Sequence, residues 1–91
     1  MELKWTAKAL SDLARLHEFL VSVNKSAADR TVQALARAPN GLLTNPRLGE
    51  QLFQFQSREV RRILVAQYEM RYEIVEETIY VLRIWHTREN R

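Results

Sequence analysis

The chain has 91 residues, of which 46% are hydrophobic, and its fourteen Lys and Arg against eleven Asp and Glu give a net charge of +3. This length predicts a single domain built around one core, and the slight basic excess favours acidic partners. The lack of cysteine excludes disulfides and thiolate metal sites.

The N-terminal third has the pattern of a short strand followed by a helix. Apolar and polar residues alternate from Met1 to Trp5, which predicts a brief strand added to a sheet. Thr6 is placed to cap a helix from Ala7 to about Val23. We expect one apolar stripe on this helix, formed by Leu10, Leu13, Leu16, Phe19, Leu20 and Val23.

A second helix follows a break at residues 24–25, and the two helices are expected to form a hairpin. Ser26 with Asp29 has the form of a capping box. Pro39 should end this helix near Arg37, because proline lacks the backbone donor and clashes with the preceding turn. Leu42 and Leu43 would add one further turn. The predicted inward-facing residues are Val32, Leu35, Ala36 and Ala38.

A loop connects the helices to the C-terminal third. Asn45-Pro46 and Leu48-Gly49 are turn signals. Residues 51–57 are interpreted as a polar connection held in place by Phe53 and Phe55.

Three β-prone runs at hairpin spacing fill the C-terminal third: Val60–Ala66, Glu69–Val75 and Thr78–Trp85. The middle run alternates, which predicts one buried and one polar face. Met70, Tyr72 and Ile74 are expected to be buried, and Glu69, Arg71 and Glu73 to lie on the polar side.

The order of elements predicts the fold class. A β-α-α-β-β-β chain indicates a two-layer α+β domain with the helical hairpin on one face of a mostly antiparallel sheet. The opposite sheet face is expected to be open.

Several kinds of chemistry have no candidate residues. Two glycines are too few for a phosphate-binding loop. His17 and His86, without cysteine, are too few ligands for a zinc site, which would need carboxylates at a spacing that the sequence does not offer. The serines lack a nucleophile motif. We therefore expect no cofactor and no metal. The N-terminus lacks a signal-peptide pattern and no apolar run could span a bilayer, so a cytoplasmic protein without membrane association is expected.

Arginines and aromatic residues are concentrated in the predicted sheet. Such a set suits phosphates, stacked bases or protein contacts, or alternatively forms a solvated surface of cross-strand ion pairs with the glutamates. Strict alternation places Arg83 in one row with Ile79, Val81 and Trp85, where its guanidinium requires a partner. Trp85 is interpreted as a packing residue. The set comprises Arg58, Arg61, Arg62, Arg71, Arg83, Arg88 and Arg91 with Tyr68, Tyr72, Tyr80, Trp85 and His86.

The run from Glu59 to Arg91, preceded by LLTNPRLGEQL and ending in the strand Ile84-Trp85-His86-Thr87-Arg88, resembles toxins of bacterial type II toxin–antitoxin modules in the RelE/ParE superfamily. The resemblance covers nearly the whole chain, although Pro39 interrupts a second helix that is longer in the family. It implies two alternatives: RelE-like members cleave messenger RNA on the ribosome, and ParE-like members inhibit DNA gyrase without nuclease chemistry.

The residue after Tyr68 favours the ParE-like branch. RelE-like nucleases typically carry a catalytic arginine at the matching position, and here the residue is Glu69, whose charge would repel the scissile phosphate. The resemblance therefore implies no catalytic residues. The enzymatic alternative is a ribosome-dependent endoribonuclease, and a third is a non-toxic member that only binds an antitoxin. The nuclease alternative would use Arg62, Arg71, Arg83, His86 and Arg88.

The resemblance also implies partners. A cognate antitoxin is expected to fold a disordered segment onto the toxin, giving a hetero-oligomer. The main target would be DNA gyrase, with the ribosome and its mRNA in the enzymatic alternative. The predicted antitoxin- or target-binding residues are Leu16, Phe19 and Leu20 on the helices and Arg61, Arg71, Arg83, Trp85, His86 and Arg88 in the sheet.

Overall fold

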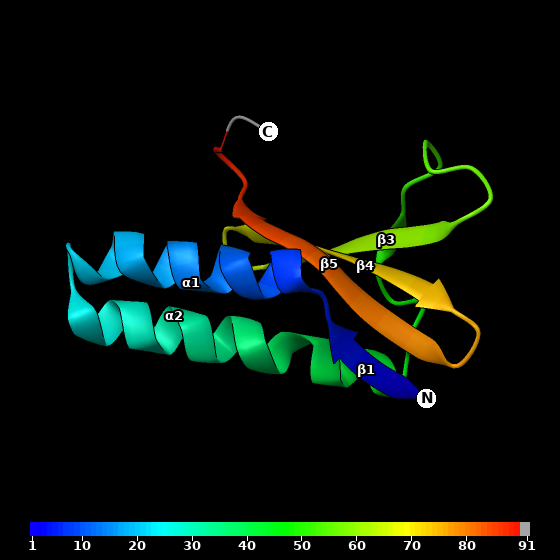
Figure 1. The fold of residues 1–91 in the computed structure, drawn as a ribbon, viewed down its shortest axis with the longest axis horizontal. Helices are drawn as coiled ribbons and strands as arrows, with labels where there is room; N and C mark the ends of the chain where they lie inside the picture. Colours follow the sequence, from blue (N-terminus) through cyan, green and yellow to red (C-terminus); the bar gives the residue numbers. More distant parts are fainter. Residues whose placement is uncertain (90–91) are drawn as a thin grey trace.

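Two helices cover one face of a five-stranded sheet in the computed structural model, which describes residues 1–89 (Figure 1). The elements in chain order are β1 (Glu2–Trp5), α1 (Ala7–Val21), α2 (Lys25–Arg37), the 3-10 helix η1 (Ala38–Leu43), β2 (Glu50–Gln51), β3 (Glu59–Val65), β4 (Tyr68–Val75) and β5 (Thr78–His86). The strands lie in the order β1-β5-β4-β3-β2. Only β1 and β5 are parallel neighbours, and the other pairs are antiparallel. The predicted α+β class is confirmed, with β2 as an unpredicted short strand inside the supposed loop.

Thr6 caps α1 as predicted and also ties the helix to the sheet. Its Oγ1 accepts a hydrogen bond from the Ala9 N–H at 3.2 Å and donates to the Val81 carbonyl at 2.8 Å. The helix ends at Val21, so the predicted extension to Val23 was wrong. An N-cap of this kind contributes about 1 kcal/mol to helix stability.

The buried side of α1 differs from the predicted stripe. Leu16 is buried as expected, but Leu10, Phe19 and Val23 are 53%, 68% and 79% exposed. The buried face of the helix contains instead Ala9, which is fully buried, Asp12 and Leu16. This row of residues and the predicted apolar row both have helical spacing, and the small Ala9 side chain lets the helix approach the sheet closely.

Asn24, not Ser26, is the N-cap of α2. Its side chain accepts from the Ala27 N–H at 3.0 Å, because the extended backbone at Asn24 follows directly on the turn after α1. The predicted capping box was therefore wrong. Asp29 binds across the hairpin, where its Oδ1 lies 2.8 Å from Nε2 of His17 on α1.

The end of α2 follows the prediction. The helix stops at Arg37, and the chain continues as η1 with Pro39 in its first turn. Leu42 is buried, so the expected further turn is confirmed as 3-10 helix. Ala36 is exposed, contrary to its predicted inward position, whereas Ala28 is fully buried.

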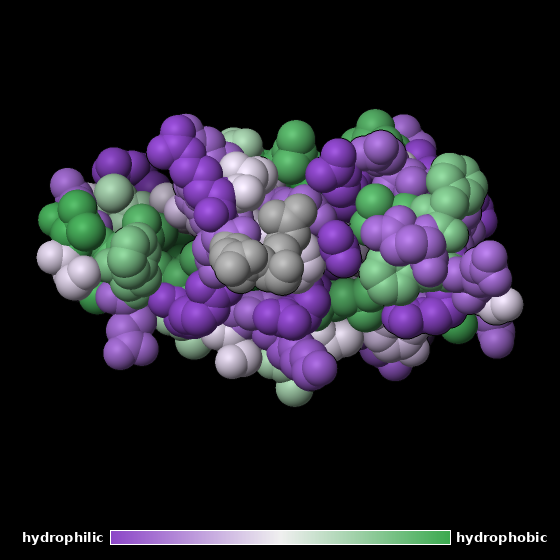
Figure 2. Space-filling view, turned by 90° about the horizontal axis from the view of Figure 1, so that it is seen from above, coloured by the Kyte–Doolittle hydropathy of each residue, from purple (hydrophilic) through white to green (hydrophobic). Residues whose placement is uncertain are grey.

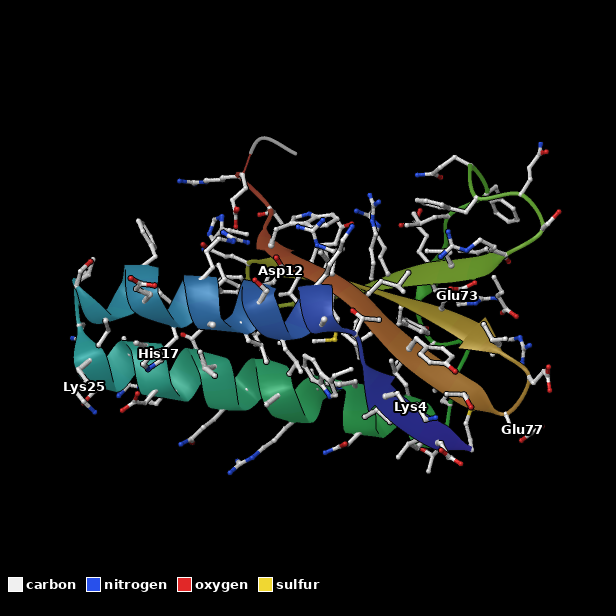
Figure 3. All side chains as sticks on the ribbon, viewed as in Figure 1. Lys4, Asp12, His17, Lys25, Glu73 and Glu77 are labelled. Carbon is white, nitrogen blue, oxygen red and sulfur yellow. The ribbon has the colours of Figure 1, made fainter. Side chains whose placement is uncertain are left out.

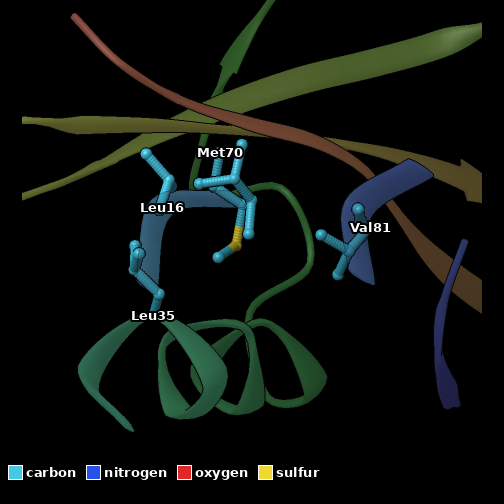
Figure 4. Close-up of a cluster of buried hydrophobic side chains, with 6 residues drawn as sticks. Leu16, Leu35, Met70 and Val81 are labelled. Atoms are coloured by element: carbon cyan, nitrogen blue, oxygen red, sulfur yellow. The ribbon is translucent and has the colours of Figure 1, made fainter. Parts of the chain in front are cut away.

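The core lies between the helices and the inner face of β4 and β5. Met70, Tyr72 and Ile74 are buried as predicted. They divide between two adjacent clusters, of which the larger is drawn in Figure 4. The larger cluster contains Ala9, Leu16, Leu35, Met70, Val81 and Ile84, and the smaller contains Leu42, Tyr72, Ile74 and Ile79.

Tyr72 also fixes the loop that leads into β2. Its hydroxyl accepts from the Gly49 N–H at 2.9 Å and donates to the Pro46 carbonyl at 2.7 Å. Burial raises the pKa of this hydroxyl, which keeps it protonated as a donor. A Cβ on Gly49 would lie 2.5 Å from the Arg62 carbonyl oxygen, so only glycine fits this close approach.

Replacing Tyr72 with phenylalanine should destabilise the fold. The Y72F variant keeps the ring but leaves the Gly49 N–H and the Pro46 carbonyl without their buried partner. We expect the free energy of unfolding in urea to fall by about 1–3 kcal/mol. Y80F removes a hydroxyl from the half-buried Tyr80 and serves as the matched control. Equal effects of the two substitutions would contradict the role given to the Tyr72 hydroxyl.

A β-bulge changes which residues of β5 share a face. Val81 pairs with Tyr72 and Arg83 pairs with Arg71, so Leu82 is the extra residue. Strict alternation was therefore the wrong prediction for this strand. After the bulge Ile84 is buried on the inner face, and Arg83 and Trp85 lie on the outer face.

Side chains of helix α1 bind the backbone of β5 beyond the point where β1 ends. β1 pairs with β5 only as far as Val81. Beyond that point Asp12, which is 4% exposed, accepts from the Ile84 N–H at 2.8 Å (Figure 3). Arg15 donates a hydrogen bond to the Ile84 carbonyl oxygen at 3.4 Å. Side chains of α1 thus satisfy the backbone groups that a neighbouring strand would otherwise bind.

Candidate functional site

The predicted binding residues divide between the two faces of the sheet. His86 pairs with Tyr68 on the helix side, and Trp85 pairs with Glu69 on the outer side. The helix side holds a groove of about 630 Å³, called here the helix-side groove. Figure 2 shows hydrophobic residues gathered at the helical end of the molecule beside hydrophilic ones. The groove is lined by Arg15, Leu16, Phe19, Leu20, Gln67, Tyr68, His86, Arg88 and Glu89.

One wall of the helix-side groove is apolar. Leu16 is buried at its base, Leu20 is half-buried, and Phe19 is 68% exposed at the rim. An ion pair between Arg15 and Glu89, at 2.8 Å, closes one side. The groove thus brings together the three helical residues that the sequence predicted to bind a partner.

The other wall is formed by His86 and its neighbours. Its Nδ1 accepts from the Arg88 N–H at 3.1 Å, so the neutral ring carries its proton on Nε2 and donates to Gln67 Oε1 at 3.1 Å. Tyr68 meets the imidazole edge-on at 5.2 Å. Both ring nitrogens are engaged, which leaves this histidine poorly placed as a general base.

Glu69 lies at the centre of the outer sheet face and is 1% exposed. Its carboxylate accepts from Arg71 Nε at 3.0 Å and from Arg62 Nη1 at 3.2 Å. Glu69 thus lies on the predicted polar side of β4, but it is buried there. The paired arginines and the neighbouring Trp85 exclude water from a position that alternation alone assigns to solvent.

Arginines and aromatic rings alternate across the same face. The Arg71 guanidinium lies 4.8 Å from the Trp85 ring centre and 5.7 Å from the Phe55 ring centre. Arg83 lies 5.6 Å from Trp85 on the same strand, and Arg58 lies 5.8 Å from Phe55. Trp85 is only 6% exposed, so the packing role predicted for it is confirmed.

The partner required by Arg83 is Asp12. Arg83 donates from Nε and Nη2 to the two carboxylate oxygens at 2.9 and 3.2 Å. Burial raises the pKa of Asp12, but hydrogen bonds from Arg83 and the Ile84 N–H outweigh it and hold that pKa below its usual range. Hydrogen bonding to Asp12 in turn raises the pKa of Arg83.

Arg61 belongs to neither surface. It donates to the Gly49 carbonyl at 2.7 Å and to Glu59 at 2.9 Å, which anchors the loop at β2. Burial raises the pKa of Glu59, and hydrogen bonds from Arg61 and Arg47 more than offset it, so the net shift is downward. Arg91, the last residue of the predicted arginine set, lies outside the described residues.

The residues of the nuclease alternative are not assembled into one site. Arg62, Arg71 and Arg83 lie on the outer face, each within 3.2 Å of a carboxylate oxygen. His86 and Arg88 line the groove on the opposite side. Within residues 1–89 no group of three or more acidic or histidine side chains is placed to hold a metal ion. None of the helices in that part of the chain is long and apolar enough to cross a membrane.

Comparison with known proteins identifies the family. The model of the ParE toxin of the type II toxin–antitoxin system, parDE, matches residues 3–91. The chain belongs to the ParE toxin family. It is thus a ParE-type toxin of a type II toxin–antitoxin system, and the expected resemblance is confirmed.

A solved structure supports the fold of this ParE-type toxin. A chain from the chromosomal ParDE toxin–antitoxin system of P. aeruginosa is 24% identical, with a TM-score of 0.78 over 94% of this chain and 95% of that chain. No curated protein matches significantly. The family implies an antitoxin as partner of this toxin.

Two residues that organise the outer face, Asp12 and Phe55, were not predicted from the sequence. Asp12 was overlooked, although a lone acid in the row Ala9, Asp12, Leu16 interrupts an apolar helix face and signals a buried partner. Phe55 was assigned only to holding a loop, whereas Phe53 beside it is 77% exposed. No sequence signal distinguished these two phenylalanines.

Proposed function

We propose that this ParE-type toxin acts by binding DNA gyrase without cleaving RNA, and that a cognate antitoxin neutralises it by filling the helix-side groove. The observation that carries the first part is the buried Glu69 between Arg62 and Arg71. The carboxylate occupies the place where a ribonuclease of this superfamily would need positive charge.

Electrostatics supports a non-catalytic role for the outer face. The Glu69 carboxylate contributes a repulsion of about 3 kcal/mol to a phosphate about 5 Å away at an effective dielectric constant of about 20, which offsets the attraction of the arginines paired with it. Cleavage also increases the negative charge on the phosphate, which donors without a nearby anion would stabilise. Asp12 and Glu73 likewise hold Arg83 and Arg58 in ion pairs. The face favours contacts with protein over phosphoryl chemistry.

Two parallel assays test this function. Purified toxin should inhibit DNA supercoiling by gyrase or trap gyrase-cleaved DNA, because binding alone is sufficient for this effect. It should leave messenger RNA intact in a translating extract. Normal supercoiling at a large molar excess of folded toxin would contradict the proposal. Codon-positioned RNA cuts would support the ribosomal alternative, and no growth arrest without antitoxin would support a purely antitoxin-binding protein.

The helix-side groove supports the antitoxin part of the proposal. Its wall of Leu16, Phe19 and Leu20 offers apolar area to an amphipathic segment, and Arg15, Arg88 and Glu89 add charged positions at the rim. A disordered segment that folds on binding would gain its affinity chiefly from this apolar burial.

An aspartate at Phe19 should weaken antitoxin binding. Phe19 is 68% exposed in the free toxin, so F19D should leave the fold intact while removing apolar contact from the complex. Burial of this side chain would contribute about 1.5–3 kcal/mol to the binding free energy. Its loss should raise the Kd about 10- to 100-fold, which calorimetry with the antitoxin measures. V23D is the matched control, because Val23 is 79% exposed and does not line the groove. Equal Kd values for the two variants would place the antitoxin elsewhere.

A further inference from the structure

The outer sheet face contains a second recess, called here the sheet-face cleft. It has a volume of about 450 Å³ and opens between the first turn of α1, the bulge in β5 and the loop after β2. The bulge residue Leu82 contributes apolar surface, and Phe55 from the loop contributes another apolar wall. The residues that matter for its chemistry are Lys8, Phe55, Arg58, Arg71, Leu82 and Arg83.

The cleft has more cations than anions. Arg58, Arg71 and Arg83 each pair with one carboxylate, from Glu73, Glu69 and Asp12 respectively. Two of these carboxylates are shared, since Glu69 also binds Arg62 and Asp12 also lies 3.6 Å from Arg15. Lys8 is exposed and makes no ion pair within residues 1–89.

The arginines keep donors for a further partner. Arg71 binds Glu69 through Nε, and Arg83 binds Asp12 through Nε and Nη2. Their remaining guanidinium N–H groups are fixed in position by those ion pairs and by the Trp85 ring beside both. Pre-oriented donors lose little conformational entropy when an external carboxylate binds.

We propose that the sheet-face cleft docks an acidic segment of the protein on which the toxin acts, with a carboxylate between Lys8, Arg71 and Arg83 and an apolar side chain against Leu82 and Phe55. This inference rests on the proposed gyrase function and names the target surface for it. The antitoxin groove lies on the other side of the sheet. Target and antitoxin contacts are therefore separate, and substitutions can affect one without the other.

A nucleic acid backbone fits the cleft less well than an acidic peptide. Binding to nucleic acid draws its affinity from neutralising several phosphates with free Lys and Arg. Here the arginines are already paired with carboxylates, and Lys8 is the cation left over. One or two carboxylates with an apolar neighbour match both the small charge excess and the apolar walls.

Charge reversal at Lys8 tests the inference. K8E should raise the Kd of the toxin for purified gyrase by about ten-fold or more, since it replaces the unpaired cation with an anion. R37E is the matched control: Arg37 is exposed at the end of α2, outside the cleft, and the substitution makes the same change in net charge. R37E should change the Kd less than about two-fold, and both variants should bind antitoxin as the parent does. Thermal unfolding verifies that both variants are folded.

The outcomes separate this inference from the proposed function. If the parent toxin binds gyrase and K8E binds it with the same Kd, the cleft is not the target site. The proposed gyrase function then still stands. If the parent does not bind gyrase, the function fails, and the cleft is then probed with a synthetic Glu- and Phe-rich peptide by NMR. Chemical-shift changes confined to Lys8, Leu82 and Arg83 would support binding of an acidic ligand in the cleft. The absence of such changes would overturn the inference. Stronger binding of a short DNA duplex than of the peptide would also overturn it.

Discussion

Neutralising Glu69 should both destabilise the toxin and create affinity for RNA. In the E69Q variant the guanidinium groups of Arg62 and Arg71 lose the carboxylate that they share at 3.2 and 3.0 Å. Since the two arginines are only 35% and 22% exposed, we expect the free energy of unfolding to fall by about 2–4 kcal/mol. The released cations should raise the affinity for a short single-stranded RNA by about ten-fold at low salt.

The matched control for this prediction is E50Q. Glu50 also binds Arg62, at 2.8 Å, but its side chain is 64% exposed. Its loss should therefore change stability and RNA affinity little. Chemical unfolding measures the first quantity, and fluorescence anisotropy across a salt series measures the second. RNA affinity that is the same in E69Q and the parent would refute the view that Glu69 keeps phosphates off this face.

Removal of Asp12 should destabilise the toxin about as much as neutralisation of Glu69. The D12A variant leaves the Ile84 N–H without its acceptor and Arg83 without its two-point partner. We expect a loss of about 3 kcal/mol and a melting temperature lower by about 10 °C or more. D12N keeps one oxygen for the Ile84 N–H, and its melting temperature should lie between those of D12A and the parent. D29N, on the exposed outer part of the hairpin, is the control expected to melt close to the parent.

The same carboxylate gives stability a dependence on pH. The folded-state pKa of Asp12 lies below its unfolded value, so its contribution is fully present above the unfolded pKa of about 3.9. That contribution is lost as the pH falls through the lower folded pKa. The difference in stability between the parent and D12N should therefore be constant from about pH 7 to about pH 5 and should shrink below about pH 4. A difference that stays constant down to pH 2 would contradict this.

The sequence predicted the order of elements because its strongest signals are local. Alternation at Met70, Tyr72 and Ile74, the cap at Thr6 and the interruption at Pro39 each depend on a few neighbouring residues, and all agree with the structure. The wrong predictions concern positions whose structure is determined by contacts with residues far away in the sequence. Two helical stripes were possible on α1, and the sheet selected the one with Ala9, which only the packed structure reveals.

The candidate surfaces were less predictable than the fold for the same reason. The bulge at Leu82 is fixed by pairing with Tyr72 and Arg71, and no residue type marks it in the sequence. It moved Arg83 and Trp85 to the outer face and so separated them from Ile79 and Val81, which face the core. The residue after Tyr68 was recognised as an anion, but its burial depends on arginines from two strands.

The parallel pairing of β1 with β5 also determines when during synthesis the N-terminal elements can dock on the sheet. Thr6 bonds to Val81, 75 positions later, so the first strand and first helix have no docking site until the last strand has left the ribosome. Both the groove and the cleft contain residues of β5. Nascent chains and fragments that end before β5 therefore lack both surfaces.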